Sequence, residues 1–165
     1  MILLLGFMGS GKSAVGRELA QRLGWPFADL DERIAAAEGC SIPEIFERQG
    51  EEAFRRAEQR ELRGVLASFP ASSVVALGGG TFVQPGNAEL IEQAGALTVW
   101  LDAPLELLRE RCLPEGGTRP LAADPERFAA LYHQRLPFYA RARLRVNAAA
   151  PLDNVVEQVL AGCNT

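Results

Sequence analysis

A phosphate-binding motif lies close to the start of the chain. Residues 6–13 read Gly-Phe-Met-Gly-Ser-Gly-Lys-Ser and match the P-loop pattern G-x-x-x-x-G-K-[ST]. The apolar run 2–5 before it is typical of a buried strand, and a helical pattern of apolar residues over about 12–23 follows it. A strand, a glycine loop and a helix start in this order direct backbone N–H groups at a phosphate. A glycine turn that binds nothing is the alternative, and the complete motif in this setting favours nucleotide binding.

The residues of this loop have distinct expected roles. Lys12 is long enough to reach the β- and γ-phosphates of ATP, and the Ser13 hydroxyl can hold Mg²⁺. The residues expected to contact the nucleotide here are Gly9, Ser10, Gly11, Lys12, Ser13 and Ala14. We therefore predict ATP and Mg²⁺ as the groups that the chain binds.

Length and composition indicate one globular domain, 1–165. The sequence is 48% hydrophobic and 23% charged, which is typical of a globular protein with a sizeable core. No apolar run reaches 18 residues, so we expect no membrane span. Because the P-loop starts at residue 6, we expect no signal peptide either.

Charge and cysteine content narrow the partners and the compartment. The net charge of −4 argues against a nucleic-acid partner. Cys40, Cys112 and Cys163 are odd in number and widely spaced, so we expect reduced thiols in a cytoplasmic protein and no zinc site.

Short apolar segments alternate with helical patterns along the whole chain. Strands are expected at about 2–5, 25–28, 73–77, 96–101 and 144–147. This alternation predicts an α/β fold with a parallel sheet and right-handed crossovers. Helix breaks are expected at Gly50 and at Pro137.

Two aspartates follow the second expected strand. Asp29 and Asp31 stand at its carboxyl end, where ligands bind in open α/β sheets. One carboxylate can hold Mg²⁺ through water, and the other can accept a hydrogen bond or proton from a substrate hydroxyl. Alternatively, Asp31 caps the next helix, which does not exclude a ligand contact.

Two arginines lie on or beside apolar helix stripes. Glu58 falls on the stripe formed by Phe54 and Leu62, and Arg55 is three residues away. Glu58 then either orients the Arg55 guanidinium toward an anionic ligand or forms an ordinary surface ion pair with it. Arg135 lies on the apolar face of a later helix and is a second candidate to bind an anion.

Two flexible segments complete the expected site. Gly78, Gly79 and Gly80 follow the third strand and permit close approach of a ligand to the backbone, although a tight turn is the alternative. The segment 113–124 carries Arg119 between glycines and proline. We expect it to be a mobile lid that closes over ATP rather than an ordinary surface loop.

Taken together, these segments resemble shikimate kinase over nearly the whole chain. The matching blocks are Gly-Ser-Gly-Lys-Ser (9–13), Asp-x-Asp (29–31), Phe-Arg-Arg-x-Glu (54–58), Gly-Gly-Gly (78–80), Thr-Arg-Pro-Leu (118–121) and Arg-x-Pro-x-Tyr (135–139). The resemblance implies transfer of the ATP γ-phosphate to the 3-hydroxyl of shikimate, in the pathway to chorismate and aromatic amino acids. It also implies a three-layer α/β/α P-loop kinase fold, with strand order 2-3-1-4-5, and a monomer.

The resemblance further implies roles for individual residues. Lys12, Asp31 and Arg119 would be catalytic, with Asp31 as the candidate base. Ser13 and Asp29 would attend Mg²⁺, and Arg111 and Pro151 would flank adenine. The acceptor region at about 31–63 would combine with other segments to bind shikimate, through Asp31, Phe46, Phe54, Arg55, Gly78, Gly79, Gly80 and Arg135.

Two other functions remain open from the sequence. One is another small-molecule kinase on the same scaffold, such as a gluconate-type or nucleotide kinase. The other is an ATP-binding module without catalysis, although Lys12, Asp31 and Arg119 are all present.

Overall fold

A five-stranded parallel sheet forms the centre of the protein. The computed structural model describes residues 1–113 and 124–163. The strands are β1 (Ile2–Leu5), β2 (Phe27–Asp29), β3 (Val74–Ala76), β4 (Leu97–Asp102) and β5 (Leu144–Asn147), in the order β2-β3-β1-β4-β5. All four pairings are parallel, so the carboxyl ends of all the strands meet at one edge.

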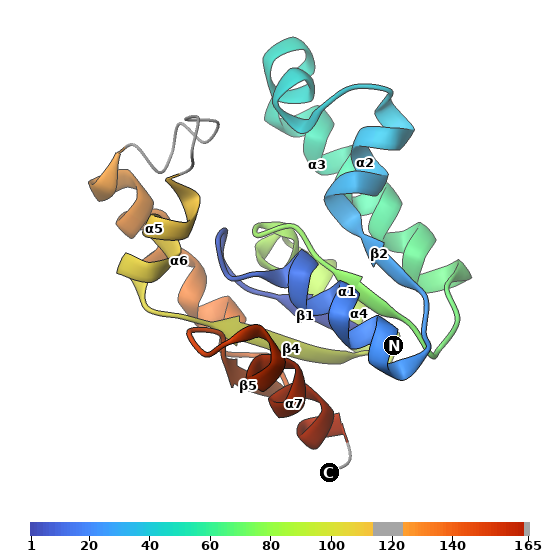
Figure 1. Ribbon diagram of the computed structural model, residues 1–165. Helices are drawn as coiled ribbons and strands as arrows, with labels where there is room; N and C mark the ends of the chain where they lie inside the picture. The colour runs from blue at the N-terminus through green and yellow to red at the C-terminus, as the bar shows by residue number, and fades with distance from the viewer. Residues whose placement is uncertain (114–123, 164–165) are drawn as a thin grey trace.

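Helices cover both faces of this sheet. They are α1 (Lys12–Leu23), α2 (Leu30–Glu38), α3 (Ile42–Ser68), α4 (Asn87–Gln93), α5 (Leu105–Cys112), α6 (Pro125–Tyr139) and α7 (Leu152–Cys163), with a 3₁₀ turn η1 (Thr81–Val83). In Figure 1, α1 and α7 lie together on one face and α4 and α6 on the other. The expected three-layer fold and strand order are confirmed.

The central strands are buried on both sides because β1 and β3 carry continuous apolar runs. Leu3, Leu4, Val74 and Val75 have no exposed surface. Such runs are typical of parallel strands between two helical layers. The packed centre holds the carboxyl edge rigidly, and α2 with α3 rises on one side of it while α5 with α6 lies on the other (Figure 1).

Local details differ from the sequence prediction at two helices. The first concerns α2, which begins at Leu30, immediately after β2, so that Asp31 lies in its first turn. The second concerns Pro137, which lies inside α6 without ending it. Pro137 removes one helical hydrogen bond, and the helix continues because the Ala140 N–H still donates to the Leu136 carbonyl. The expected break at Gly50 is confirmed, since φ there is 81° and ψ is 174° within α3.

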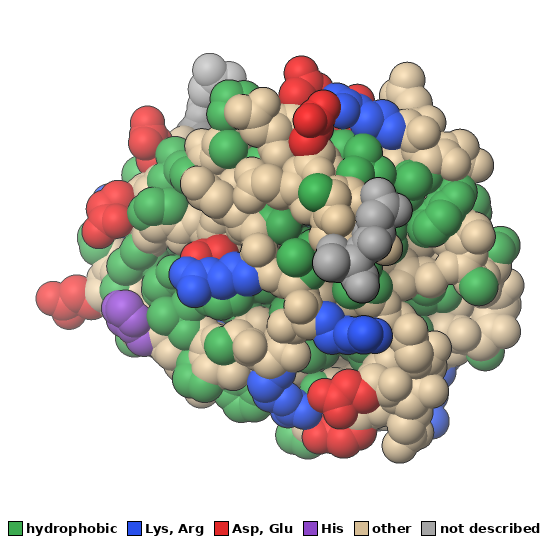
Figure 2. Space-filling model, turned by 90° about the horizontal axis from the view of Figure 1, so that it is seen from below, with side chains coloured by type: hydrophobic (Ala, Val, Ile, Leu, Met, Phe, Trp, Pro, Cys, Tyr) green, Lys and Arg blue, Asp and Glu red, His purple; other side chains and the backbone are tan. Residues whose placement is uncertain are grey.

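Basic and acidic side chains intermingle on the face that Figure 2 shows, where several basic groups lie next to acidic ones. Among the helices of residues 1–113 and 124–163, none is both long and apolar enough to cross a membrane.

Candidate active site

The P-loop connects β1 to α1 at the carboxyl edge of the sheet. Gly11, with φ of 87°, immediately precedes the first turn of α1. The Lys12 ammonium donates hydrogen bonds of 3.0 Å to the carbonyl oxygens of Gly6 and Phe7, so its side chain folds back along the loop. A β-carbon on Gly9 would lie 2.6 Å from the Leu108 carbonyl oxygen, which means that only glycine lets the loop pack against α5.

Two hard oxygen ligands meet beside this loop. The Ser13 hydroxyl donates a hydrogen bond of 2.5 Å to Asp29 Oδ2. Asp29 Oδ1 accepts a 3.0 Å bond from the Asp31 backbone N–H and so caps α2. A hydroxyl and a carboxylate fit Mg²⁺, which takes one or two protein ligands and keeps several waters. The described residues contain no cluster of three or more His, Cys, Asp or Glu side chains for another kind of metal site.

Asp31 lies over the glycine segment that follows β3. Its Oδ1 would be 2.7 Å from a β-carbon on Gly78. The helix cap considered for Asp31 belongs to Asp29 instead, because β2 ends one residue before α2 begins. The Asp31 side chain is exposed and therefore accessible to a substrate hydroxyl.

Arg55 and Glu58 form a largely buried pair on α3. Glu58 is 1% exposed, and its Oε2 accepts a 2.8 Å hydrogen bond from Arg55 Nη1. The alternative of an ordinary surface ion pair is therefore wrong. Arg55 also packs its guanidinium 5.0 Å from the centre of the Phe54 ring, which holds it from the other side.

The two arginines converge on Gly80. A β-carbon at Gly80 would lie 3.0 and 3.1 Å from the terminal nitrogens of Arg55 and 3.2 Å from one of Arg135. The guanidinium of Arg135 lies 5.5 Å from the centre of the Phe7 ring. Two guanidinium groups that meet over a bare backbone form a site for a carboxylate or another small anion.

Aromatic side chains border the same region. The rings of Phe46 and Phe54 are 4.7 Å apart, and Phe46 is 39% exposed. An exposed ring beside a cationic site offers an apolar wall to a ligand with a carbon ring.

Arg111 links the P-loop to the segment after β5. Its Nη1 donates to the carbonyl oxygens of Ala148, at 3.0 Å, and Gly9, at 3.5 Å. Pro151, which precedes α7, is exposed. Arg119 and most of the expected lid lie outside the described residues, which resume at Asp124.

Two buried hydroxyl groups support the glycine segment, and the sequence reasoning assigned neither a role. The Tyr139 hydroxyl donates to the Gly79 carbonyl at 2.5 Å, and the Thr81 hydroxyl donates to Glu58 Oε1 at 2.7 Å. Two sequence features could have indicated these roles. Thr81 directly follows the glycine run, and Tyr139 lies one helical turn after Arg135.

We expect Tyr139→Phe to lower the free energy of unfolding by about 0.5–1.5 kcal/mol, because the half-buried Gly79 carbonyl loses its donor. Burial raises the pKa of Tyr139 to about 12 from the ordinary 10. The folded pKa lies above the unfolded one, so this contribution is complete below pH 10 and is lost as pH rises from 10 to 12. Urea unfolding at pH 8 and pH 11 measures both effects.

The matched control is Tyr132→Phe, since the Tyr132 hydroxyl is 3.4 Å from its acceptor. Equal losses in both variants at pH 8 would contradict the prediction.

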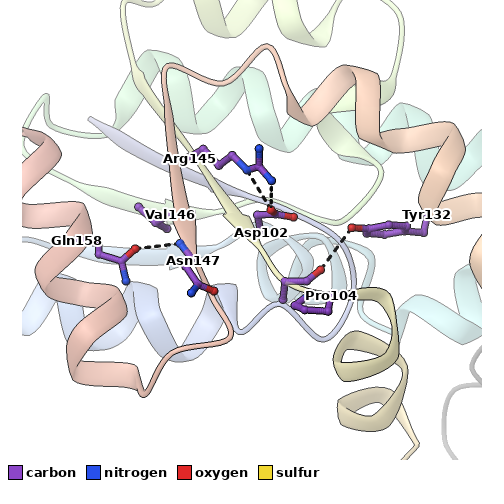
Figure 3. A pocket seen from close by; sticks show the side chains of 8 residues that line it. Asp102, Pro104, Tyr132, Arg145, Val146, Asn147 and Gln158 are labelled. Carbon is purple, nitrogen blue, oxygen red and sulfur yellow. Dashed lines mark hydrogen bonds and ion pairs between the residues drawn. The ribbon is translucent and has the colours of Figure 1, made fainter.

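A separate hollow lies at the carboxyl ends of β4 and β5 (Figure 3). Its polar groups bond with one another: Arg145 donates to Asp102 at 3.0 and 2.6 Å, and Gln158 accepts from the Asn147 N–H at 3.0 Å. None of the predicted site residues lines it. The candidate active site is therefore the region between the P-loop and Gly78–Gly80.

Comparisons with known proteins point to one family. The sequence model of the family described as shikimate kinase matches residues 8–164. A shikimate kinase from Ruegeria pomeroyi is 43% identical, over 99% of this chain and 85% of that protein. The chain belongs to the shikimate kinase family.

Solved structures of the family share the fold. Shikimate kinase from Aquifex aeolicus matches with a TM-score of 0.88 at 34% identity, over 99% of this chain and 96% of that one. Shikimate kinase from Acinetobacter baumannii, in complex with shikimate, matches with a TM-score of 0.87 at 33% identity, over 96% of this chain and 89% of that one.

The rival sugar-acid kinases share only the scaffold. A gluconokinase from Sinorhizobium meliloti matches over 99% of this chain and 90% of the gluconokinase chain, with a TM-score of 0.63 at 21% identity. Family membership makes this protein an ATP-using kinase. It therefore excludes the alternative that the chain is an ATP-binding module without catalysis.

Proposed function

We propose that this protein transfers the γ-phosphoryl group of ATP to the 3-hydroxyl of shikimate, a step toward chorismate and the aromatic amino acids. The observation that carries the proposal is the convergence of Arg55 and Arg135 on Gly80, next to Asp31. Shikimate is a hydroxylated ring with one carboxylate. It therefore needs a planar cationic site for the carboxylate and an acceptor for its hydroxyl groups, and both are present.

The acceptor occupies the region between α3 and the glycine segment in this account. Arg55 and Arg135 bind its carboxylate, and the backbone of Gly78, Gly79 and Gly80 contacts it. Asp31 receives its hydroxyl groups. Phe46 and Phe54 form the apolar wall. This arrangement is supported by the distances from Gly78 and Gly80 and by the stacked rings.

ATP lies along the P-loop in this account, with adenine between Arg111 and Pro151. The backbone from Gly9 to Ala14 surrounds the phosphates, and Lys12 leaves its loop carbonyls to reach the γ-phosphate. Ser13 directly, and Asp29 through water, would hold Mg²⁺. Bound there, this ion would neutralise charge on the phosphate oxygens.

The chemistry is an in-line displacement. The 3-hydroxyl oxygen of shikimate forms a bond to the γ-phosphorus while the bond from that phosphorus to the bridging oxygen of ADP breaks. The hydroxyl proton passes to the Asp31 carboxylate. Lys12 and Arg119 stabilise charge on the transferring group, and ADP leaves with the electron pair. The products are shikimate 3-phosphate and ADP, and ³¹P NMR of the product identifies the phosphorylated position.

We further propose that the protein works as a monomer in the cytoplasm. Cys40, Cys112 and Cys163 are all free thiols, which is usual in a reducing compartment. Sedimentation velocity of the purified protein tests the oligomeric state.

We expect Arg55→Lys to raise the KM for shikimate by about 10- to 100-fold, because a charge-assisted hydrogen bond contributes about 1.5–3 kcal/mol. Lysine keeps the charge but loses the planar fork. The turnover number is expected to change by no more than about threefold, since the contact also exists in the ground state. Steady-state kinetics with varied shikimate gives both values.

The matched control is Arg56→Lys, one residue away. Arg56 is exposed and pairs with Glu52 on the outer surface of α3. We expect this variant to behave as wild type. If the KM of Arg55→Lys equalled that of Arg56→Lys, Arg55 would not bind the acceptor.

A further inference from the structure

We propose that Thr81 is a positioning residue for acceptor binding, whose buried hydroxyl fixes Glu58 and thereby aligns the Arg55 guanidinium. This inference rests on the proposed function, because it concerns the carboxylate site for shikimate. It adds a fully buried residue to those proposed for the acceptor site.

The two oxygens of Glu58 serve two different donors. Oε1 accepts from the Thr81 hydroxyl at 2.7 Å, and Oε2 accepts from Arg55 Nη1 at 2.8 Å. Thr81 is 0% exposed and Glu58 is 1% exposed, so water does not compete for these bonds. A carboxylate is planar, so a donor that fixes one oxygen also fixes the direction of the other. Thr81 therefore sets the direction in which Glu58 holds Arg55.

The backbone of Thr81 is itself anchored on both sides. Its N–H donates to the Gly78 carbonyl at 3.1 Å, and its carbonyl accepts from Asn87 Nδ2 at 2.9 Å. The side-chain amide of Gln59, on α3, lies 3.5 Å from Asn87 Oδ1. The hydroxyl is thus presented from a fixed point between α3 and α4, which is what a positioning group requires.

The Thr81 hydroxyl also lies next to Gly78, at the edge of the proposed acceptor region. A β-carbon on Gly78 would be 2.9 Å from Thr81 Oγ1, 3.3 Å from Glu58 Oε1 and 2.7 Å from Asp31 Oδ1. A displacement of Glu58 at this point therefore reaches the acceptor region. Without the hydroxyl, Glu58 Oε1 is buried without its donor, and Arg55 is the nearby cation toward which the carboxylate can turn. The guanidinium then shares both Glu58 oxygens and leaves the alignment over Gly80.

The test is Thr81→Val, which keeps the β-branched shape and removes the donor. We expect the KM for shikimate to rise about tenfold, which corresponds to about 1.4 kcal/mol. The turnover number and the KM for ATP are expected to stay within about twofold, because acceptor binding is weakened equally in the ground state and in the transition state. Thr81→Ser restores the hydroxyl and is expected to restore most of the affinity.

The matched control is Thr98→Val on β4. Thr98 is also buried, and its hydroxyl accepts a 3.0 Å bond from the Arg143 N–H, away from the glycine segment. It controls for the loss of any buried threonine hydroxyl. We expect its thermal unfolding midpoint to fall without any change in the KM for shikimate.

A double mutant separates action through Glu58 from a local effect. If Thr81 acts through Glu58, Thr81→Val in a Glu58→Gln background changes the KM for shikimate by less than about twofold. The positioning role is overturned if Thr81→Val leaves the KM for shikimate at the Thr98→Val value. It is also overturned if both KM values and the turnover number change together. A wild-type protein that does not phosphorylate shikimate would overturn the proposed function itself, and this role with it.

Discussion

Asp31→Asn is expected to lower the turnover number by about 10²- to 10⁴-fold, the usual contribution of a positioned general base. Asparagine has nearly the same shape and still hydrogen-bonds a hydroxyl, but it cannot take the proton. The Asp31 backbone N–H still donates to Asp29, so the start of α2 should be preserved. Steady-state and single-turnover kinetics with saturating ATP and shikimate measure the effect on the chemical step.

Glu32→Gln provides the matched control for this prediction. Glu32 lies in the same turn of α2 and pairs with Arg17 on the exposed surface. Removing its charge is expected to leave turnover at the wild-type rate. If both variants reacted as fast as wild type, Asp31 would not be the base, although its contact with the acceptor could stand.

Lys12→Ala is expected to lower the turnover number by about 10²- to 10³-fold, as the loss of one preorganised donor to the developing charge usually does. In the structure the Lys12 ammonium bonds to two carbonyls of its own loop, and we expect it to exchange these bonds for the γ-phosphate. The melting temperature should change little, because the side chain does not belong to the apolar core.

Lys12 is also the only lysine in the sequence, which allows a chemical test of its place. An amine-reactive reagent should modify Lys12 and the N-terminal amine, and MgATP should protect Lys12 alone. Mass spectrometry of the labelled peptides measures the extent of modification at each amine, with and without MgATP. Labelling of Lys12 that MgATP does not reduce would contradict a place beside the phosphates.

The sequence predicted well those helix and strand bounds that depend on residues close together in the chain. Residues 2–5 and 144–147 form strands at the expected bounds, and α1 spans 12–23. Gly6 follows the first strand and Gly24 follows α1, and these glycines mark both ends in the sequence. Ser41 and Glu44, three residues apart in the sequence, form a capping box at the start of α3. In each of these cases the residues that decide the structure are neighbours in the chain.

The features that the sequence could not decide depend on contacts between distant segments. The choice between a surface pair and a buried pair for Arg55 and Glu58 depended on Thr81, which lies 23 residues from Glu58 and approaches it only in the folded chain. The cap of α2 likewise depended on where the helix begins: it starts at Leu30, so Asp29 is the cap that was considered for Asp31. Periodicity gives the face of a helix, but it does not give the partner on the other side.

The glycine segment is the common point of these results. Asp31, Arg55 and Arg135 come from three different helices, and each is close to Gly78 or Gly80. A side chain at either position would occupy space that these groups now use. The backbone after β3 therefore sets the distance between the candidate base and the anion site, which is the geometry that an acceptor with one carboxylate and several hydroxyls needs.

The most direct test is acceptor-dependent ADP release with MgATP, measured in a coupled assay with shikimate, gluconate and a nucleoside monophosphate in parallel. This account predicts ADP release well above the acceptor-free rate with shikimate alone. Release with gluconate or the nucleoside monophosphate and none with shikimate would contradict it, because the site formed by Asp31, Arg55 and Arg135 would then serve a different acceptor.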